Sequence, residues 1–76
     1  MNEQRRKTLS RAQSLIEDAK AIIEEVKGEE EEAFENMPES MQSGDKGEKT
    51  QAGIEALSEA YDSLDSAIDQ ISTAAE

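Results

Sequence analysis

The stretch TQAGIEALSEAYDSLDSAIDQISTAA, residues 50–75, decides the fold of this chain. One series of mostly apolar residues recurs at alternating spacings of four and three, and we call it the seam. Its members are Thr50, Ile54, Leu57, Tyr61, Leu64, Ile68, Ile71 and Ala75. This spacing places them along one face of an α-helix, whereas a strand would alternate at every second residue. The pattern predicts a helix over about residues 46–74, with small alanines beside the stripe that let a second helix approach closely.

A second periodic series occupies the N-terminal half of the chain. It follows spacings of three and four through Leu9, Ala12, Ile16, Ala19, Ile23 and Val26. Leu15 and Ile22 widen the stripe on one side, which is typical of a helix packed in a bundle. Glutamate is a good helix former, so we expect this helix to continue with looser packing and to cover about residues 3–37.

The segment between the two series, about residues 38–45, has the composition of a connector. Pro38 disfavours a helical conformation at the preceding residue. Asn36 is three residues before Glu39 and is expected to cap a short turn, and Asp45 is expected to be the N-cap of the second helix. Gly44 and Gly47 are expected to let the backbone reverse.

The sequence therefore predicts an all-α fold in which residues 1–76 form a single antiparallel two-helix hairpin. Charge supports this orientation, because it brings a basic cluster beside an acidic one. The basic cluster consists of Arg5, Arg6, Lys7 and Arg11, and the acidic one of Asp65, Asp69 and Glu76.

One hairpin cannot bury both apolar stripes, because two helices leave much of a wide stripe exposed to water. We therefore expect the hairpin to dimerise into a four-helix bundle with twofold symmetry, or to form a higher helical oligomer. The residues expected to mediate this self-association are Leu15, Ile22, Ile54, Leu57, Leu64 and Ile68.

The composition excludes several classes of activity and partner. The chain has 19 acidic and 8 basic side chains and a net charge of -11, so direct contact with nucleic acid or an anionic membrane is disfavoured and a basic protein is favoured. It has no His and no Cys, which removes the usual general bases, thiol nucleophiles and metal ligands. We expect no enzymatic activity, no cofactor and no bound metal. The lack of Cys and of a long apolar run favours a cytoplasmic location.

Carboxylates recur every seventh residue on the second helix, at Glu48, Glu55, Asp62, Asp69 and Glu76. Such residues are either the solvated face of an amphipathic helix or an acidic array that mimics nucleic acid. Apolar residues near the connector offer a different contact. The candidate partner-binding residues are Glu29, Glu30, Glu31, Glu32, Phe34, Met37, Met41, Glu55, Asp62 and Asp69.

The connector sequence EAFENMPESMQ, residues 32–42, is followed by Gly44 and Gly47. This segment resembles small acidic proteins of phages and prophages, which carry an N-[ML]-P-E-S-[ML]-Q connector before an acidic amphipathic helix. The resemblance covers about residues 30–70. It implies a viral or mobile-element origin and a location in the cytoplasm of an infected or lysogenic bacterium. Accessory phage proteins often bind and block a host protein, so the resemblance also implies an inhibitor.

Three hypotheses for function remain open at this point. The first is an interaction protein that inhibits or sequesters a host factor involved in defence or nucleic-acid handling. The second is a purely structural helical oligomerisation module. The third is a binder of a small ligand held in a pocket between the helices of an oligomer.

Overall fold

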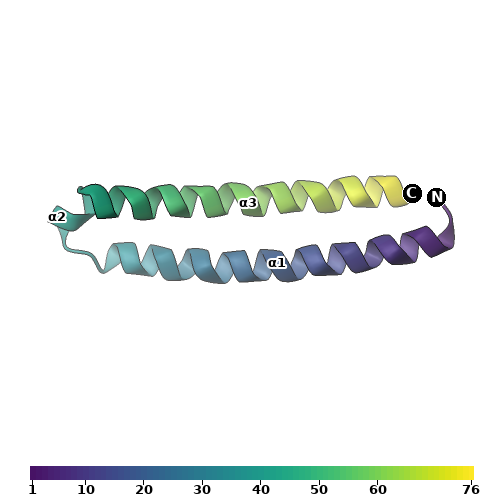
Figure 1. Ribbon diagram of the computed structural model, residues 1–76, viewed down its shortest axis with the longest axis horizontal. Coiled ribbons are helices and arrows are strands. Elements are labelled where there is room, and N and C mark those ends of the chain that lie inside the picture. Colours follow the sequence, from purple (N-terminus) through teal and green to yellow (C-terminus); the bar gives the residue numbers. More distant parts are fainter.

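The computed structural model describes residues 1–76 and is entirely helical, with 89% of residues in helices and no strand. The order of elements is α1 (Glu3–Glu35), α2 (Glu39–Gln42) and α3 (Asp45–Ala75). Figure 1 shows α1 and α3 side by side and antiparallel, with the short α2 at the turn and both termini at the opposite end. The predicted all-α hairpin is confirmed for the single chain.

Helix α1 begins where the sequence predicts and ends two residues early. The side chain of Asn2 caps its first turn, with the Arg5 amide donating to Asn2 Oδ1 at 2.8 Å. At the other end Asn36 is the C-cap, and its amide donates to the Glu32 carbonyl at 3.0 Å. The expectation that Asn36 is the N-cap of the following turn was wrong, because that position belongs to Pro38.

The start of α3 also differs from expectation. Gly44, and not Asp45, is the N-cap, since the Gly44 carbonyl accepts the first helical hydrogen bond from the Glu48 amide at 3.0 Å. Asp45 is instead the first helical residue, where a carboxylate interacts favourably with the helix dipole.

The glycines of the connector do not reverse the backbone through unusual dihedral angles. No residue has a positive φ. Gly47 lies inside α3 and is the one buried residue of the chain. A Cβ at this position would overlap the main chain of Gln42, 2.6 Å from its Cα. Glycine is required here because α2 packs directly against the backbone of α3.

Two side-chain contacts fix the register between α1 and α3. Gln13 donates to Ser72 Oγ at 2.9 Å, and one heptad further along α1 Lys20 pairs with Asp65, one heptad earlier on α3. One heptad forward on α1 and one heptad back on α3 lead from the first contact to the second. Both contacts therefore belong to the same antiparallel register. Gln42 closes the turn, since its Nε2 donates to the carbonyls of Phe34 at 3.0 Å and Met37 at 3.2 Å.

The seam predicted for α3 is confirmed, because every one of its seam residues is partly covered by α1. The seam of α1 drifts in its C-terminal part. Val26, expected to face inward, is exposed, and its neighbour Lys27 is half-buried instead. The covered positions of α1 thus move by one residue after Ile23, whereas those of α3 keep the predicted series.

The hairpin is long and thin and has no buried apolar residue. It measures 58 × 15 × 12 Å, with a radius of gyration of 17.2 Å. A compact protein of this length has a radius of gyration of about 11 Å. The apolar residues between the helices are half-buried, so one side of the seam remains in contact with water.

Candidate protein-interaction surfaces

The first candidate surface lies near the connector end of the hairpin and contains much of the predicted partner-binding set. Phe34 from α1 and Ile54 from α3 are its apolar residues. They line a groove of about 290 Å³ together with Glu31, Glu35, Gln51 and Glu55. The helices therefore bring three carboxylates and one aromatic ring to a single place, an arrangement that suits a cationic side chain with an apolar stem.

The other predicted residues of this end do not line the groove and differ in exposure. Glu29 and Glu32 are exposed, as is Glu31 in the groove, whereas Glu30 is half-buried on the side that faces α3. Met37 is half-buried at the end of α1, and Met41 of α2 is 38% exposed. The two methionines thus cover the turn without forming a large apolar patch.

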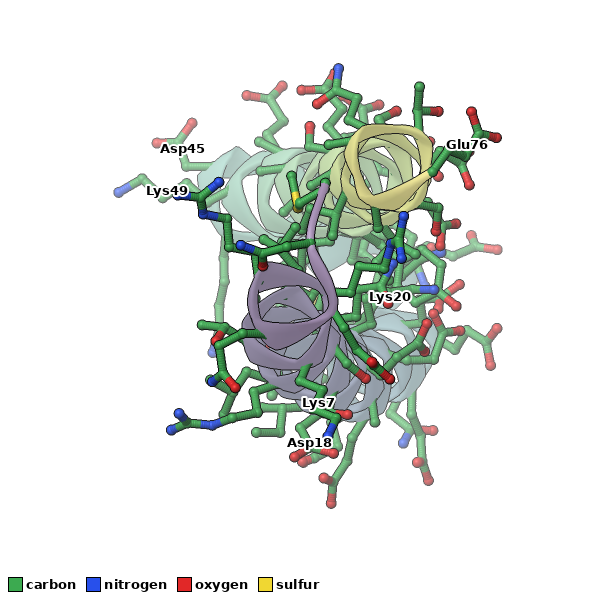
Figure 2. The ribbon with its side chains drawn as sticks, turned by 90° about the vertical axis from the view of Figure 1, so that its right-hand side faces the viewer. Lys7, Asp18, Lys20, Asp45, Lys49 and Glu76 are labelled. Atoms are coloured by element: carbon green, nitrogen blue, oxygen red, sulfur yellow. The ribbon has the colours of Figure 1, made fainter.

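Asp62 and Asp69 belong to a different part of the rod. They follow Glu55 along α3 at intervals of one heptad, or about 10 Å each. All three carboxylates are exposed, as are Glu48 and Glu76. In Figure 2 many side chains around α3 point away from α1 and end in oxygen. The predicted partner-binding set therefore divides into a groove at the connector end and a stripe along α3.

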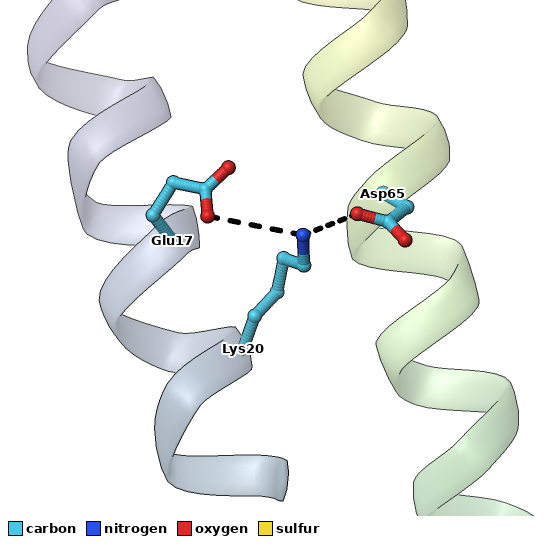
Figure 3. A network of polar contacts seen from close by, with 3 residues as sticks. All are labelled: Glu17, Lys20 and Asp65. Atoms are coloured by element: carbon cyan, nitrogen blue, oxygen red, sulfur yellow. Dashed lines mark ion pairs between the residues drawn. The ribbon is translucent and has the colours of Figure 1, made fainter.

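One cation lies between the two helices. Lys20 of α1 forms an ion pair with Asp65 of α3 and a longer one, at 3.8 Å, with Glu17 of its own helix (Figure 3). Its ammonium group also lies 4.8 Å from the ring centroid of Tyr61, within the range of a cation–π contact. The side chain of Lys20 is only 12% exposed. The hydrogen bond to Asp65 is the largest cause that raises the pKa of Lys20 above its ordinary value.

The N-terminal basic cluster does not form the ion pairs expected of it. Arg6 reaches the end of α3, but it donates to main-chain oxygens, that of Ala75 at 2.7 Å and that of Glu76 at 3.1 Å. Arg5, Lys7 and Arg11 make no ion pair within the chain, whose only ion pairs are those of Lys20. The antiparallel orientation is as predicted, but the charges of the cluster remain available to other groups.

The residues predicted to mediate self-association also divide into two groups. Ile54, Leu57, Leu64 and Ile68 are half-buried against α1 within the same chain. Leu15 and Ile22 are 68% and 60% exposed and touch solvent on the flank of α1. The second group is the more exposed, whereas the first group keeps only part of its surface in contact with water.

Two further features bear on the type of site. No group of three or more His, Cys, Asp or Glu side chains is arranged to hold a metal ion. Neither long helix contains a stretch apolar enough to cross a bilayer. The hollows of the surface have volumes of about 250 to 320 Å³ and are grooves open to solvent.

Comparison of the sequence with family models, with curated proteins and with solved structures finds no match. Function must therefore be inferred from the residues of the chain itself.

Sequence reasoning missed Lys20, Gln42, Glu35 and Gln51. The role of each depends on the register of the helices or on the path of the turn, neither of which the periodic pattern specifies. One signal was present for Lys20, because it lies beside Ala19 on the flank of the predicted stripe. A long cation at such a position can lay its stem along the seam.

Proposed function

We propose that this protein is a non-enzymatic acidic interaction protein that binds and sequesters a basic partner at the connector end of the hairpin. The observation that carries the proposal is the groove in which Glu31, Glu35 and Glu55 surround Phe34 and Ile54. An arginine or lysine of the partner would place its charge among the carboxylates and its stem on the ring. Such a residue could make charge-assisted hydrogen bonds to the carboxylates and a cation–π contact with the ring.

The net charge of -11 supports the same partner class, because it steers basic proteins toward the rod and repels acidic ones. The resemblance of the connector to small phage proteins supports an inhibitor that acts in the cytoplasm of a bacterial host. A host factor that handles nucleic acid has the basic surface that this groove requires.

In a broader version of this proposal, the carboxylate stripe of α3 would also imitate the phosphates of nucleic acid. The stripe of α3 offers one carboxylate per about 10 Å of helix, whereas duplex DNA carries one phosphate charge per about 1.7 Å of axis. The stripe alone is therefore far too sparse to imitate a duplex. The groove is the stronger candidate because it adds an apolar contact to the charges.

The test uses a fluorescent peptide of ten arginines as a probe of the partner class, followed by capture from a bacterial lysate at low and high salt. Replacing Glu31, Glu35 and Glu55 by Gln should weaken binding of the peptide by about tenfold or more. Phe34→Leu keeps the apolar volume but removes the aromatic face, so it should weaken arginine binding by severalfold.

A matched control removes the same number of charges elsewhere. Asp62→Asn, Asp69→Asn and Glu76→Gln change the net charge equally but lie outside the groove. This control should lower the association rate at about 50 mM salt and have little effect at about 500 mM. Equal losses in the groove variant and the control at both salt concentrations would refute the groove and leave only a diffuse charge effect.

The second candidate function is a structural module that acts by self-association. It is favoured by the absence of any buried apolar residue and by the exposure of Leu15 and Ile22. In this case the four-helix bundle or higher oligomer expected from the sequence would be the functional form. A pocket for a small ligand between helices would also require a second copy, because a single hairpin offers only open grooves.

A further inference from the structure

Helix α1 has a second apolar face that α3 does not cover. Leu15, Ile22 and Val26 are 68%, 60% and 41% exposed. Helix α3 has no large apolar residue that is exposed. Spacings of seven and four residues place the three on one side of α1. We call these three residues the outer face.

The exposed area of the chain exceeds that of a compact protein of its size. The surface measures 5549 Å². A compact monomer of 8.3 kDa is expected to expose about 4,600 Å². The surplus of about 1,000 Å² is close to what one partner loses in a dimer interface of standard size, about 800 Å².

We propose that the outer face is a homodimer interface at which the α1 helices of two copies pack antiparallel, with Leu15 of one copy on Ile22 of the other. The inference rests on the self-association of the second candidate function, and it adds the face, the orientation and the register. It differs from the bundle predicted from the sequence, because it pairs the flanks of the two α1 helices and does not use the α3 residues of that bundle.

Charge complementarity selects the antiparallel orientation. In this register Lys7 of one copy lies near Glu29 of the other, and Arg11 lies near Glu25. Within one chain Lys7 and Arg11 have no ion-pair partner. Figure 2 shows Lys7 on the side of α1 that points away from α3. A parallel pair would instead bring Arg11 against Arg11 and Glu25 against Glu25.

The surface beside Leu15 is shaped to receive a side chain. Ser10, Arg11, Ser14, Leu15 and Asp18 line a hollow of about 320 Å³. Ile22 of the second copy lies over this hollow in the proposed register. Asp18 lies on the same side of α1 as Lys7 in Figure 2. In the proposed register it falls next to the twofold axis and faces Asp18 of the second copy. This one like-charge contact opposes association and makes the proposal easy to test.

Sedimentation equilibrium between about 5 and 500 μM protein tests the interface. The wild type should approach twice 8.3 kDa as concentration rises. Leu15→Gln should weaken dimerisation by about a hundredfold, because each dimer loses two buried leucines. Asp18→Asn should strengthen it by about threefold to tenfold, because it removes the repulsion at the axis. Ala56→Gln, at an exposed position of α3, is the matched control and should leave it unchanged.

Cysteine cross-linking tests the orientation, because the chain has no cysteine of its own. Asp18→Cys should form a disulfide-linked dimer with itself. Arg11→Cys should link to Glu25→Cys in a mixture, but not to itself. Self-linking of Arg11→Cys would show a parallel pair and overturn the proposal. So would a folded wild type that remains a monomer at about 500 μM.

Circular dichroism of each variant separates dissociation from unfolding. If Leu15→Gln proves unfolded, Asp18→Asn and Asp18→Cys still test the interface, because both remove the like charges at the axis and keep the apolar contacts. Binding of the arginine peptide, measured with Leu15→Gln, separates this inference from the proposed groove. If monomeric Leu15→Gln still binds the peptide, the groove does not depend on the dimer. If Ala56→Gln abolishes dimerisation, the outer face is refuted and the groove is not.

Discussion

Helices α1 and α3 have nearly equal lengths, 33 and 31 residues, but they use their apolar residues differently. All the large apolar residues of α3 face α1. Those of α1 divide between the seam, where Ile16 and Ile23 lie, and the outer face of Leu15, Ile22 and Val26. Helix α3 therefore presents one apolar face, whereas α1 presents two.

The two helices thus separate the residues that stabilise the hairpin from those available for association. The seam supports the hairpin itself, because its residues lose part of their water contact inside one chain. The outer face adds little to a single hairpin, and in the proposed dimer a second copy would cover its apolar residues. Substitutions in the two places should then differ in their dependence on protein concentration.

The largest expected effect comes from Leu64→Gln in the seam of α3. It removes apolar contact and partly buries an amide, so the free energy of unfolding should fall by about 2 to 3 kcal/mol at every protein concentration. Ile22→Gln in the outer face should destabilise only at concentrations at which the wild type is associated. Thermal unfolding at several concentrations measures both. If the stability of both variants depended on protein concentration in the same way, the seam and the outer face would not differ in function.

The next effect concerns Gly47 of α3. A Cβ there would overlap the main chain of Gln42, so Gly47→Ala should destabilise the protein by about 1 to 3 kcal/mol as α2 is pushed away. The displacement should also break the hydrogen bonds from Gln42 to the carbonyls of Phe34 and Met37. Chemical denaturation measures the loss, and hydrogen exchange should locate it at the C-terminal turn of α1. An unchanged or raised stability would show that α2 does not pack as described.

A smaller effect of opposite sign is expected for Gly28 of α1. A Cβ at this position meets nothing within 4 Å, so Gly28→Ala should stabilise the helix by about 0.5 to 1 kcal/mol. Gly53 of α3 is equally open and is the matched control, with the same expected gain. A loss of stability at Gly28 alone would indicate that the acidic part of α1 is bent or covered in solution.

The sequence predicted α3 better than α1. The spacing of α3 runs without interruption from Thr50 to Ala75, and each of its seam residues faces α1. In α1 the same rule failed at Val26, which is exposed while its neighbour Lys27 is half-buried. Spacing thus specifies the existence of a face more securely than its exact members.

The candidate site was predictable only in part for a related reason. Glu31, Phe34 and Glu55 were recognised as charged or apolar residues near the connector, but their meeting in one groove depends on the register. Asn36 and Asp45 were wrongly predicted as N-caps, because several polar residues of the connector fit the same spacing rule. Backbone hydrogen bonds, which the sequence does not reveal, decide between them.

The smallest expected effect concerns the ion pair that joins the helices at Lys20. Its hydrogen bond to Asp65 raises the pKa of Lys20, so the folded state holds this proton more tightly than the unfolded chain. The resulting stabilisation is fully present below the pKa of an unfolded lysine, about 10.4, and is lost as pH rises through the higher pKa of the folded state. Lys20→Gln should therefore lower the melting temperature at pH 7 and 9, and the difference from the wild type should shrink above about pH 10.5.

Taking the difference between the variant and the wild type cancels the pH dependence that the two proteins share. Lys49→Gln is the control, because Lys49 of α3 makes no ion pair and Figure 2 shows it pointing into solvent. Its difference from the wild type should stay small and nearly constant with pH. A Lys20 difference that persists at pH 12 would mean that the stem of Lys20, packed between the helices beside Tyr61, stabilises the hairpin through contact and not through its charge.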